Sequence, residues 1–143
     1  MFFTYFYQYI ILYRYLFNGL NALKELNMEE NQLMTISGHS FSFLKALKIA
    51  KFSNNYLTLE DSYHEYPDLF GSKSPFYDCV SLEELYLANN NISKIFSDWI
   101  LSDLGLRKLD LKYNNISLIR VSKSIWKKIT FKIKINTFEI FDL

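Results

Sequence analysis

The chain has 143 residues, which is enough for one domain of ordinary size. Its formal net charge is +1, so the charge of the whole chain favours neither a nucleic acid nor an acidic partner. The single cysteine, Cys79, excludes an internal disulfide. In a secreted protein an odd cysteine indicates a partner outside the chain, whereas an unpaired buried or loop cysteine also fits a reducing compartment. Both interpretations stay open.

Residues 1–16 form an aromatic N-terminal segment that is apolar enough to suggest a signal peptide or a membrane segment. No Lys or Arg stands at its start, however, and no small-residue cleavage site follows it. A spanning helix needs about 20 apolar residues, and this run is interrupted by Gln8 and Arg14. We therefore expect no membrane span. The alternatives to a signal or anchor are a degenerate first coil that acts as a cap and a segment foreign to the gene product.

From residue 17 onwards, apolar residues and an asparagine recur at a fixed interval. The first unit consists of Phe17, Leu20, Leu23, Leu26, Met28, Asn31, Leu33 and Ile36. The second unit follows 24 residues later with Phe41, Leu44, Leu47, Ala50, Phe52, Asn55 and Leu57. An alternative alignment that uses Ile49 instead of Ala50 breaks this interval, and we reject it.

The third unit is delayed, because Asn55 and Asn90 are 35 residues apart instead of 24. The extra residues fall in segment 59–80, which carries both prolines and Gly71 and has the composition of a loop. We predict an inserted loop at 59–80. Insertions in repeat proteins lie on one face, which is often the binding face.

The best-preserved pair of units follows this loop. Leu82, Leu85, Leu87, Asn90, Ile92 and Ile95 recur 24 residues later as Leu106, Leu109, Leu111, Asn114, Ile116 and Ile119. This pattern, L-x-x-L-x-L-x-x-N-x-L, is typical of a leucine-rich repeat. The alternating leucines predict a short half-buried strand, and an asparagine at the following turn can satisfy backbone groups that face the interior. We predict a structural ladder made of Asn31, Asn55, Asn90 and Asn114.

Residues 120–143 form a basic C-terminal segment in which the pattern fades. Ile133 and Ile135 would occupy the two strand positions of a degenerate fifth repeat, although Phe138 stands where the asparagine is expected. The sequence thus predicts an α/β leucine-rich repeat solenoid: a short horseshoe arc with a parallel sheet on its concave side. Four clear repeats fill residues 17–119, with the degenerate fifth after them.

The sequence offers no constellation for catalysis. The two histidines are His39 and His64, and the acidic neighbours of His64 match no zinc pattern. Nucleophile, phosphate-binding and metalloprotease motifs are absent, and the chain has four glycines in all. We expect no enzyme activity, no cofactor and no metal.

A recognition surface is the alternative to an active site. Equivalent positions of stacked parallel strands are lateral neighbours, so exposed strand and turn residues form a continuous face. The candidates for binding on the concave side are Glu84, Tyr86, Lys108, Asp110, Lys112 and Tyr113. The pairs Glu83–Arg107 and Glu84–Lys108 are expected to meet across strands. The competing interpretation is that these are solvated strand residues.

Two glycosylation acceptors occupy the same position in successive repeats. Asn91-Ile92-Ser93 and Asn115-Ile116-Ser117 both fit N-x-[ST], and both follow a ladder asparagine directly. Asn91 and Asn115 should point to solvent. Their presence makes a secreted context plausible.

The stretch SLEELYLANNNISKIFSDWILSDLGLRKLDLKYNNISLI resembles the ectodomain of an arthropod Toll receptor, as do the loop that ends at Cys79 and the ISGHSF and LKALKIAKFSNNYL segments. The repeat core is common to all leucine-rich repeats, whereas IFSDWIL and the inserted loop are more specific. The resemblance covers residues 17–119.

This resemblance implies an extracellular horseshoe that binds a Spätzle-like cystine-knot cytokine, with receptor dimerisation, in innate immune or developmental signalling. It implies no nucleic acid partner. The cysteine-rich caps, transmembrane helix and signalling domain of the family do not match any part of this sequence. The alternative function is an orphan or truncated repeat scaffold without signalling activity.

Overall fold

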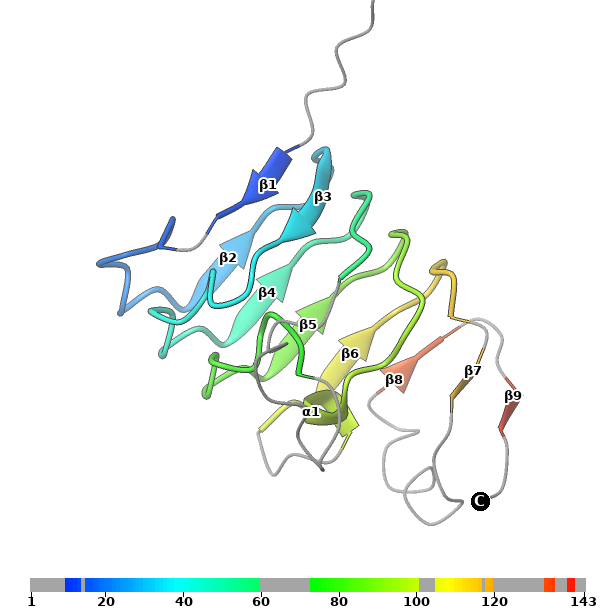
Figure 1. The fold of residues 1–143 in the computed structure, drawn as a ribbon. Coiled ribbons are helices and arrows are strands. Elements are labelled where there is room, and N and C mark those ends of the chain that lie inside the picture. Colours follow the sequence, from blue (N-terminus) through cyan, green and yellow to red (C-terminus); the bar gives the residue numbers. More distant parts are fainter. Residues whose placement is uncertain are drawn as a thin grey trace, which may run out of the picture.

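The computed structural model describes residues 10–13, 15–59, 73–100, 105–116, 118–119, 133–135 and 139–140. The described chain coils into a solenoid with one main parallel sheet and two smaller ones (Figure 1). The strands of this main sheet are β2 (Glu25–Asn27), β4 (Ile49–Lys51), β5 (Glu84–Tyr86), β6 (Lys108–Asp110) and β8 (Ile133–Lys134). They neighbour one another in this order, so each repeat adds one strand to the sheet.

The register of the main sheet confirms the spacing expected from the sequence. Leu26 pairs with Ala50, Ala50 with Leu85, Leu85 with Leu109, and Leu109 with Ile133. The offsets are therefore 24, 35, 24 and 24, and Ala50 takes the strand leucine position of the second repeat. The degenerate fifth repeat is also confirmed, since β8 continues the sheet beside β6.

Two smaller parallel sheets lie at the ends of the solenoid, on the returning segments. At the N-terminal end, β1 (Ile10–Leu12) pairs with β3 (Leu33–Ile36), and Leu12 stands opposite Ile36. At the other end, β7 (Leu118–Ile119) pairs with β9 (Glu139–Ile140) (Figure 1). Leu12 is buried, so part of the aromatic N-terminal segment extends the solenoid by a partial coil.

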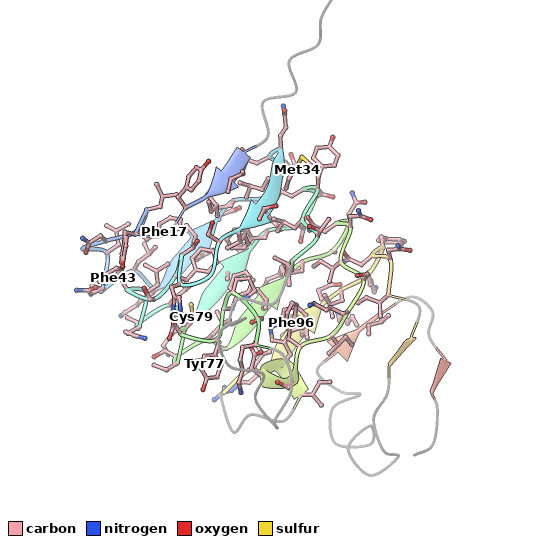
Figure 2. All side chains as sticks on the ribbon, in the orientation of Figure 1. Phe17, Met34, Phe43, Tyr77, Cys79 and Phe96 are labelled. Atoms are coloured by element: carbon pink, nitrogen blue, oxygen red, sulfur yellow. The ribbon has the colours of Figure 1, made fainter. Side chains whose placement is uncertain are left out.

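The core lies between the main sheet and the returning segments (Figure 2). The middle residues of β4, β5 and β6, which are Ala50, Leu85 and Leu109, are fully buried in it, and Leu26 of β2 packs against them half-buried. Burying a leucine side chain of this kind stabilises the fold by about 1.5–3 kcal/mol. The sheet alone cannot supply a closed core, because each coil buries its apolar side against the next one.

A row of phenylalanine rings lines the returning side of the first three coils, with Phe17, Phe41 and Phe76 at equivalent positions. Phe17 and Phe41 lie 5.5 Å apart between ring centroids, and Phe41 stacks on Phe76 at 4.9 Å. Phe76 is therefore the equivalent of Phe41 across the 35-residue interval. Aromatic pairs in these arrangements add about 0.5–1.5 kcal/mol each beyond the area that they bury.

This row shows where the third repeat begins. Phe76 and Cys79 are both buried, and they stand 35 residues after Phe41 and Leu44. Both belong to the core of the third coil, although they fall within the segment 59–80 that the sequence suggested as an inserted loop. Residues 60–72 lie outside the described residues.

The short helix α1 (Ser97–Ile100) lies in the connection between β5 and β6. Its Trp99 is buried against Phe96, with ring centroids 4.9 Å apart. Within the described ranges, no helix has the length and apolar character needed to cross a membrane.

Candidate functional site: the sheet face and the bends beside it

The asparagine of each later repeat bridges its own coil and the preceding one. The Oδ1 atoms of Asn55, Asn90 and Asn114 accept the backbone N–H of Leu33, Leu57 and Ile92 at 2.9–3.1 Å. Their Nδ2 groups donate to the carbonyls of Met28, Phe52 and Leu87 in the preceding coil, at 2.8–2.9 Å. Each side chain thus satisfies backbone groups that would otherwise be buried without partners.

Asn31 differs from these three. Its side chain is exposed, and its Nδ2 group donates within its own turn, to the carbonyls of Met28 and Glu29. Asn31 therefore stabilises a bend of the first coil without a described bridge to an earlier one.

The residue before each of these asparagines adopts a left-handed backbone conformation. Glu30, Asn54, Asn89 and Tyr113 have φ values of 56°, 60°, 55° and 56°. Asparagine tolerates this region better than most residues, whereas glutamate and tyrosine are strained there. The bends of the second and third coils are also joined side by side, because Asn89 Nδ2 donates to Asn54 Oδ1 at 2.8 Å.

The main sheet presents a connected polar group at its centre. The Tyr86 hydroxyl donates to the Glu84 carboxylate, and the Lys108 ammonium donates to that hydroxyl at 2.7 Å. The Lys108 Nζ also lies 4.5 Å from the centroid of the Tyr86 ring. These contacts raise the pKa of Lys108, with the hydrogen bond to Tyr86 as the largest cause. We call Glu84, Tyr86 and Lys108 the central triad.

The central triad corrects one expected pair. Glu84 and Lys108 are register partners, as expected, but the Tyr86 hydroxyl lies between them and no direct ion pair joins them. The tyrosine is long enough to reach both charged groups, so it replaces the direct contact.

Two lysines of the second coil, Lys48 and Lys51, form ion pairs with glutamates. Lys51 contacts Glu25 at 2.5 Å, which raises the lysine pKa. Lys48 contacts Glu83 at 2.8 Å and lowers the glutamate pKa. The expected pair between Glu83 and Arg107 is present only at 4.0 Å, and the Arg107 side chain is 80% exposed.

The remaining candidates flank β6. The Asp110 carboxylate accepts the backbone N–H of Lys112 at 3.2 Å, as Asn27 does for Glu29 in the first coil. Asp110 therefore shapes the end of its strand, as its equivalent in the first coil does. Lys112 is exposed, and the Tyr113 ring is 67% exposed beside it.

The two glycosylation acceptors lie one coil apart on the edge after the bends. Asn91 and Asn115 are exposed, while the isoleucines that follow them are buried. The coils touch directly here, since Asn115 N donates to the carbonyl of Ile92 at 2.9 Å.

A buried polar cluster, which sequence reasoning missed, joins α1 to the start of the third coil. Asp98 accepts the backbone N–H and the hydroxyl of Ser74 at 2.8 and 2.7 Å. The Trp99 indole N–H donates to the same hydroxyl at 3.0 Å. Burial raises the pKa of Asp98 against the opposing effect of these hydrogen bonds. The sequence signal was the acidic residue inside the otherwise apolar IFSDWIL run.

Of the two histidines, the structure describes His39. His39 Nδ1 lies 3.2 Å from Asp78 Oδ2, and Lys45 contacts the same carboxylate at 3.7 Å. His64 and its acidic neighbours lie outside the described residues. Among the residues that are described, no group of three or more His, Cys, Asp or Glu side chains could hold a metal ion.

The stacked parallel strands, the asparagine bridges and the exposed sheet face define a leucine-rich repeat solenoid. Residues 72–122 match the leucine rich repeat family model. This match begins before Phe76, in agreement with the place of that ring in the third coil.

The chain is similar in sequence to a mouse protein and similar in fold to several solved structures. The chain is 32% identical over 123 residues to podocan-like protein 1 of Mus musculus, covering 85% of this chain and 20% of that protein. It superposes on a chain of the Drosophila Toll–Spatzle complex with a TM-score of 0.67 at 28% identity, covering 87% of this chain and 17% of that one. The glycosylated form of that complex gives a TM-score of 0.71 at 27% identity, covering 92% and 18%.

A bacterial structure shares the fold as well. Internalin C2 of Listeria monocytogenes superposes with a TM-score of 0.57 at 24% identity, covering 84% of this chain and 45% of that one. At this identity the likeness shows the fold alone. The chain spans about a fifth of the length of the curated relative that it matches.

Proposed function

We propose that this chain is a protein-recognition module of the Toll-like receptor type, acting outside the cell in innate immune or developmental signalling. The observation that carries the proposal is the central triad, which places an aromatic ring and two charged groups on the exposed face of a rigid parallel sheet. Tyrosine is enriched among the residues that contribute most to protein interfaces. The similarity to a chain of the Toll–Spatzle complex supports the same proposal.

The partner in this proposal is a Spätzle-like cystine-knot cytokine, with receptor dimerisation as a consequence of its binding. The candidate contacts are Glu84, Tyr86, Lys108, Asp110, Lys112 and Tyr113. Because Lys108 holds the Tyr86 hydroxyl in place, the ring loses little conformational entropy when a partner packs on it. No covalent chemistry is needed for such a role.

The direct test is to titrate the folded chain with a Spätzle-like dimer and to measure binding by isothermal titration calorimetry. We expect binding that Tyr86→Ala weakens about tenfold or more. The matched control is Tyr77→Ala, which removes a ring outside the sheet strands. If the folded chain binds no such dimer, the recognition proposal is wrong, and the alternative of a repeat scaffold without signalling activity remains.

The extracellular part of the proposal has a separate test. Asn91 and Asn115 are exposed, so both are accessible to the glycosylation machinery of the secretory pathway. Protein purified from its own cells should lose mass on treatment with an N-glycosidase. Unmodified asparagines at both positions would contradict secretion.

A further inference from the structure

The cations of the solenoid fall into two groups, according to whether a carboxylate neutralises them. In the second coil, Lys48 and Lys51 each lie within 2.8 Å of a glutamate. Beside β6 the situation is different. The Arg107 guanidinium lies 4.0 Å from one carboxylate oxygen of Glu83. The other oxygen of that carboxylate makes a shorter contact, 2.8 Å, with Lys48.

Two other cations, near the ends of β6 and β8, make no ion pair within the described chain. Lys112 and Lys134 are exposed, and neither ammonium group makes an ion pair or a hydrogen bond there. Lys134 lies opposite Asp110 in the register, but the Asp110 carboxylate accepts the backbone N–H of Lys112. We call Lys112 and Lys134, which lie where the neighbouring strands β6 and β8 end, the basic end of the sheet.

An aromatic residue at the basic end is held in an unfavourable conformation. Tyr113 has a φ of 56° and is 67% exposed. The equivalent bend residues of the two preceding coils are Asn54 and Asn89, which suit this backbone region. A bulky ring that is both strained and exposed contributes little to the fold, and observed backbone strain of this kind is concentrated at functional positions.

The geometry points to an acidic segment of a partner protein, with an aromatic or apolar side chain packed on Tyr113, as the occupant of the basic end. This inference rests on the proposed recognition function and names the chemistry of its partner. Unpaired cations around an exposed ring fit carboxylates that flank an apolar side chain.

Two labelled peptides provide the first measurement. Both have about 12 residues and contain tyrosine, one with glutamates and the other with lysines in their place. Fluorescence anisotropy at low ionic strength and at about 0.15 M salt should show binding of the glutamate peptide that weakens as salt rises. The lysine peptide should bind at least about tenfold more weakly.

Charge reversal locates this binding. Lys112→Glu combined with Lys134→Glu should weaken the glutamate peptide about tenfold or more. Lys24→Glu makes the same change at an exposed position of the first coil and should leave the affinity unchanged. Circular dichroism of each variant separates lost binding from lost folding.

Substitution of the strained ring gives an independent readout. Tyr113→Asn should weaken peptide binding and at the same time stabilise the fold, a combination that a purely structural residue would not show. Glu30→Asn is the control, since it relieves the same backbone conformation in the first coil and should stabilise the fold without changing the affinity.

Several results would overturn the inference. They are equal binding of the two peptides, no binding of either, an equal effect of Lys24→Glu, and tighter binding of a heparin oligosaccharide than of the glutamate peptide. A Spätzle-like dimer that binds the double lysine variant as tightly as the unmodified chain would keep the recognition function and reject the basic end as its acidic-partner site.

Discussion

At the scale of single residues, the asparagines stabilise the fold through the hydrogen bonds of their side chains to backbone groups of neighbouring coils. Asn90 satisfies Leu57 N–H and the carbonyl of Phe52 in the preceding coil, together with the carbonyl of Leu87 in its own. Removing it leaves the Leu57 N–H without its described partner, which costs about 1–3 kcal/mol. The two carbonyls keep the amide groups of Asn55 and Asn114 as donors.

Asn90→Ala should therefore lower the free energy of unfolding by about 1–3 kcal/mol. Asn31→Ala is the comparison, because the bonds described for Asn31 stay within its own exposed turn, and it should lower the same quantity by about 1 kcal/mol or less. Urea denaturation monitored by circular dichroism measures both. Equal losses in the two variants would show that the bridge between coils adds nothing.

The left-handed bend residues provide the opposite case, in which a substitution stabilises the protein. Tyr113→Asn replaces a strained, exposed side chain with a residue that tolerates a φ of 56°. We expect the free energy of unfolding to rise by about 0.5–1 kcal/mol, as for other backbone-compatible substitutions. Asn89→Tyr, the reverse change one coil earlier, should lower it, and also breaks the contact with Asn54. A lower free energy of unfolding in Tyr113→Asn would contradict the claim that the backbone of Tyr113 is strained.

Cys79 gives a pH-dependent prediction. Burial raises the pKa of its thiol from 9.0 to about 12. Because the folded pKa lies above the unfolded one, the stabilisation is complete below about pH 9 and is lost as the pH rises towards 12, by up to about 1.4 kcal/mol per pH unit. Urea denaturation at several alkaline pH values should show this loss in the unmodified chain. Cys79→Val serves as the control, and a slope as steep as that of the unmodified chain would exclude the thiol as its cause.

At the scale of elements, α1 is tied to the start of the third coil by one hydroxyl group. The Ser74 Oγ donates to Asp98 and accepts from the indole N–H of Trp99 and from Phe76 N–H. All of these groups are buried, so losing the hydroxyl removes three hydrogen bonds and leaves the carboxyl of Asp98 with fewer donors.

Ser74→Ala should lower the free energy of unfolding by about 2–3 kcal/mol. The control is Ser53→Ala, because Ser53 is also buried but no side-chain hydrogen bond of its hydroxyl is described, and it should change stability by about 0.5 kcal/mol or less. Thermal unfolding followed by differential scanning calorimetry compares the two. Similar shifts would mean that the cluster around Ser74 is not a structural link.

The elements also show how far the sequence alone leads. Intervals of 24 residues, with a single one of 35, identify every strand of the main sheet, including the one where Ala50 replaces leucine, because strand pairing requires equivalent positions to lie side by side. The contact of Ser74 with Asp98 does not follow from any interval, since it joins two irregular segments. Cys79 falls within the predicted loop 59–80, although its position 35 residues after Leu44 marks it as a core residue.

The sheet face was predictable in position but not in detail. Lateral neighbours such as Glu84 and Lys108 follow from the register. The insertion of the Tyr86 hydroxyl between them depends on rotamers and side-chain length, which a sequence pattern does not fix. The same holds for Arg107, whose expected partner Glu83 prefers Lys48.

At the scale of the whole molecule, the solenoid separates stability from recognition. The leucines, the phenylalanine row and the asparagine bridges all act between neighbouring coils, which is how repeat proteins obtain their stability. The outward-facing strand residues take little part in this packing. They are therefore free to differ from coil to coil. Lys48 and Lys51 of the second coil are paired with glutamates, whereas Lys112 and Lys134 make no ion pair within the described chain.

The central claim is that the sheet face is the surface that contacts a partner protein, and hydroxyl-radical footprinting tests it most directly. The oxidation rates of individual tyrosines are measured by mass spectrometry in the free chain and in the presence of a Spätzle-like dimer. The account predicts that Tyr86 and Tyr113 become protected, while Tyr77, which is 37% exposed outside the sheet strands, reacts as before. Protection of Tyr77 with unchanged rates at Tyr86 and Tyr113 would contradict it.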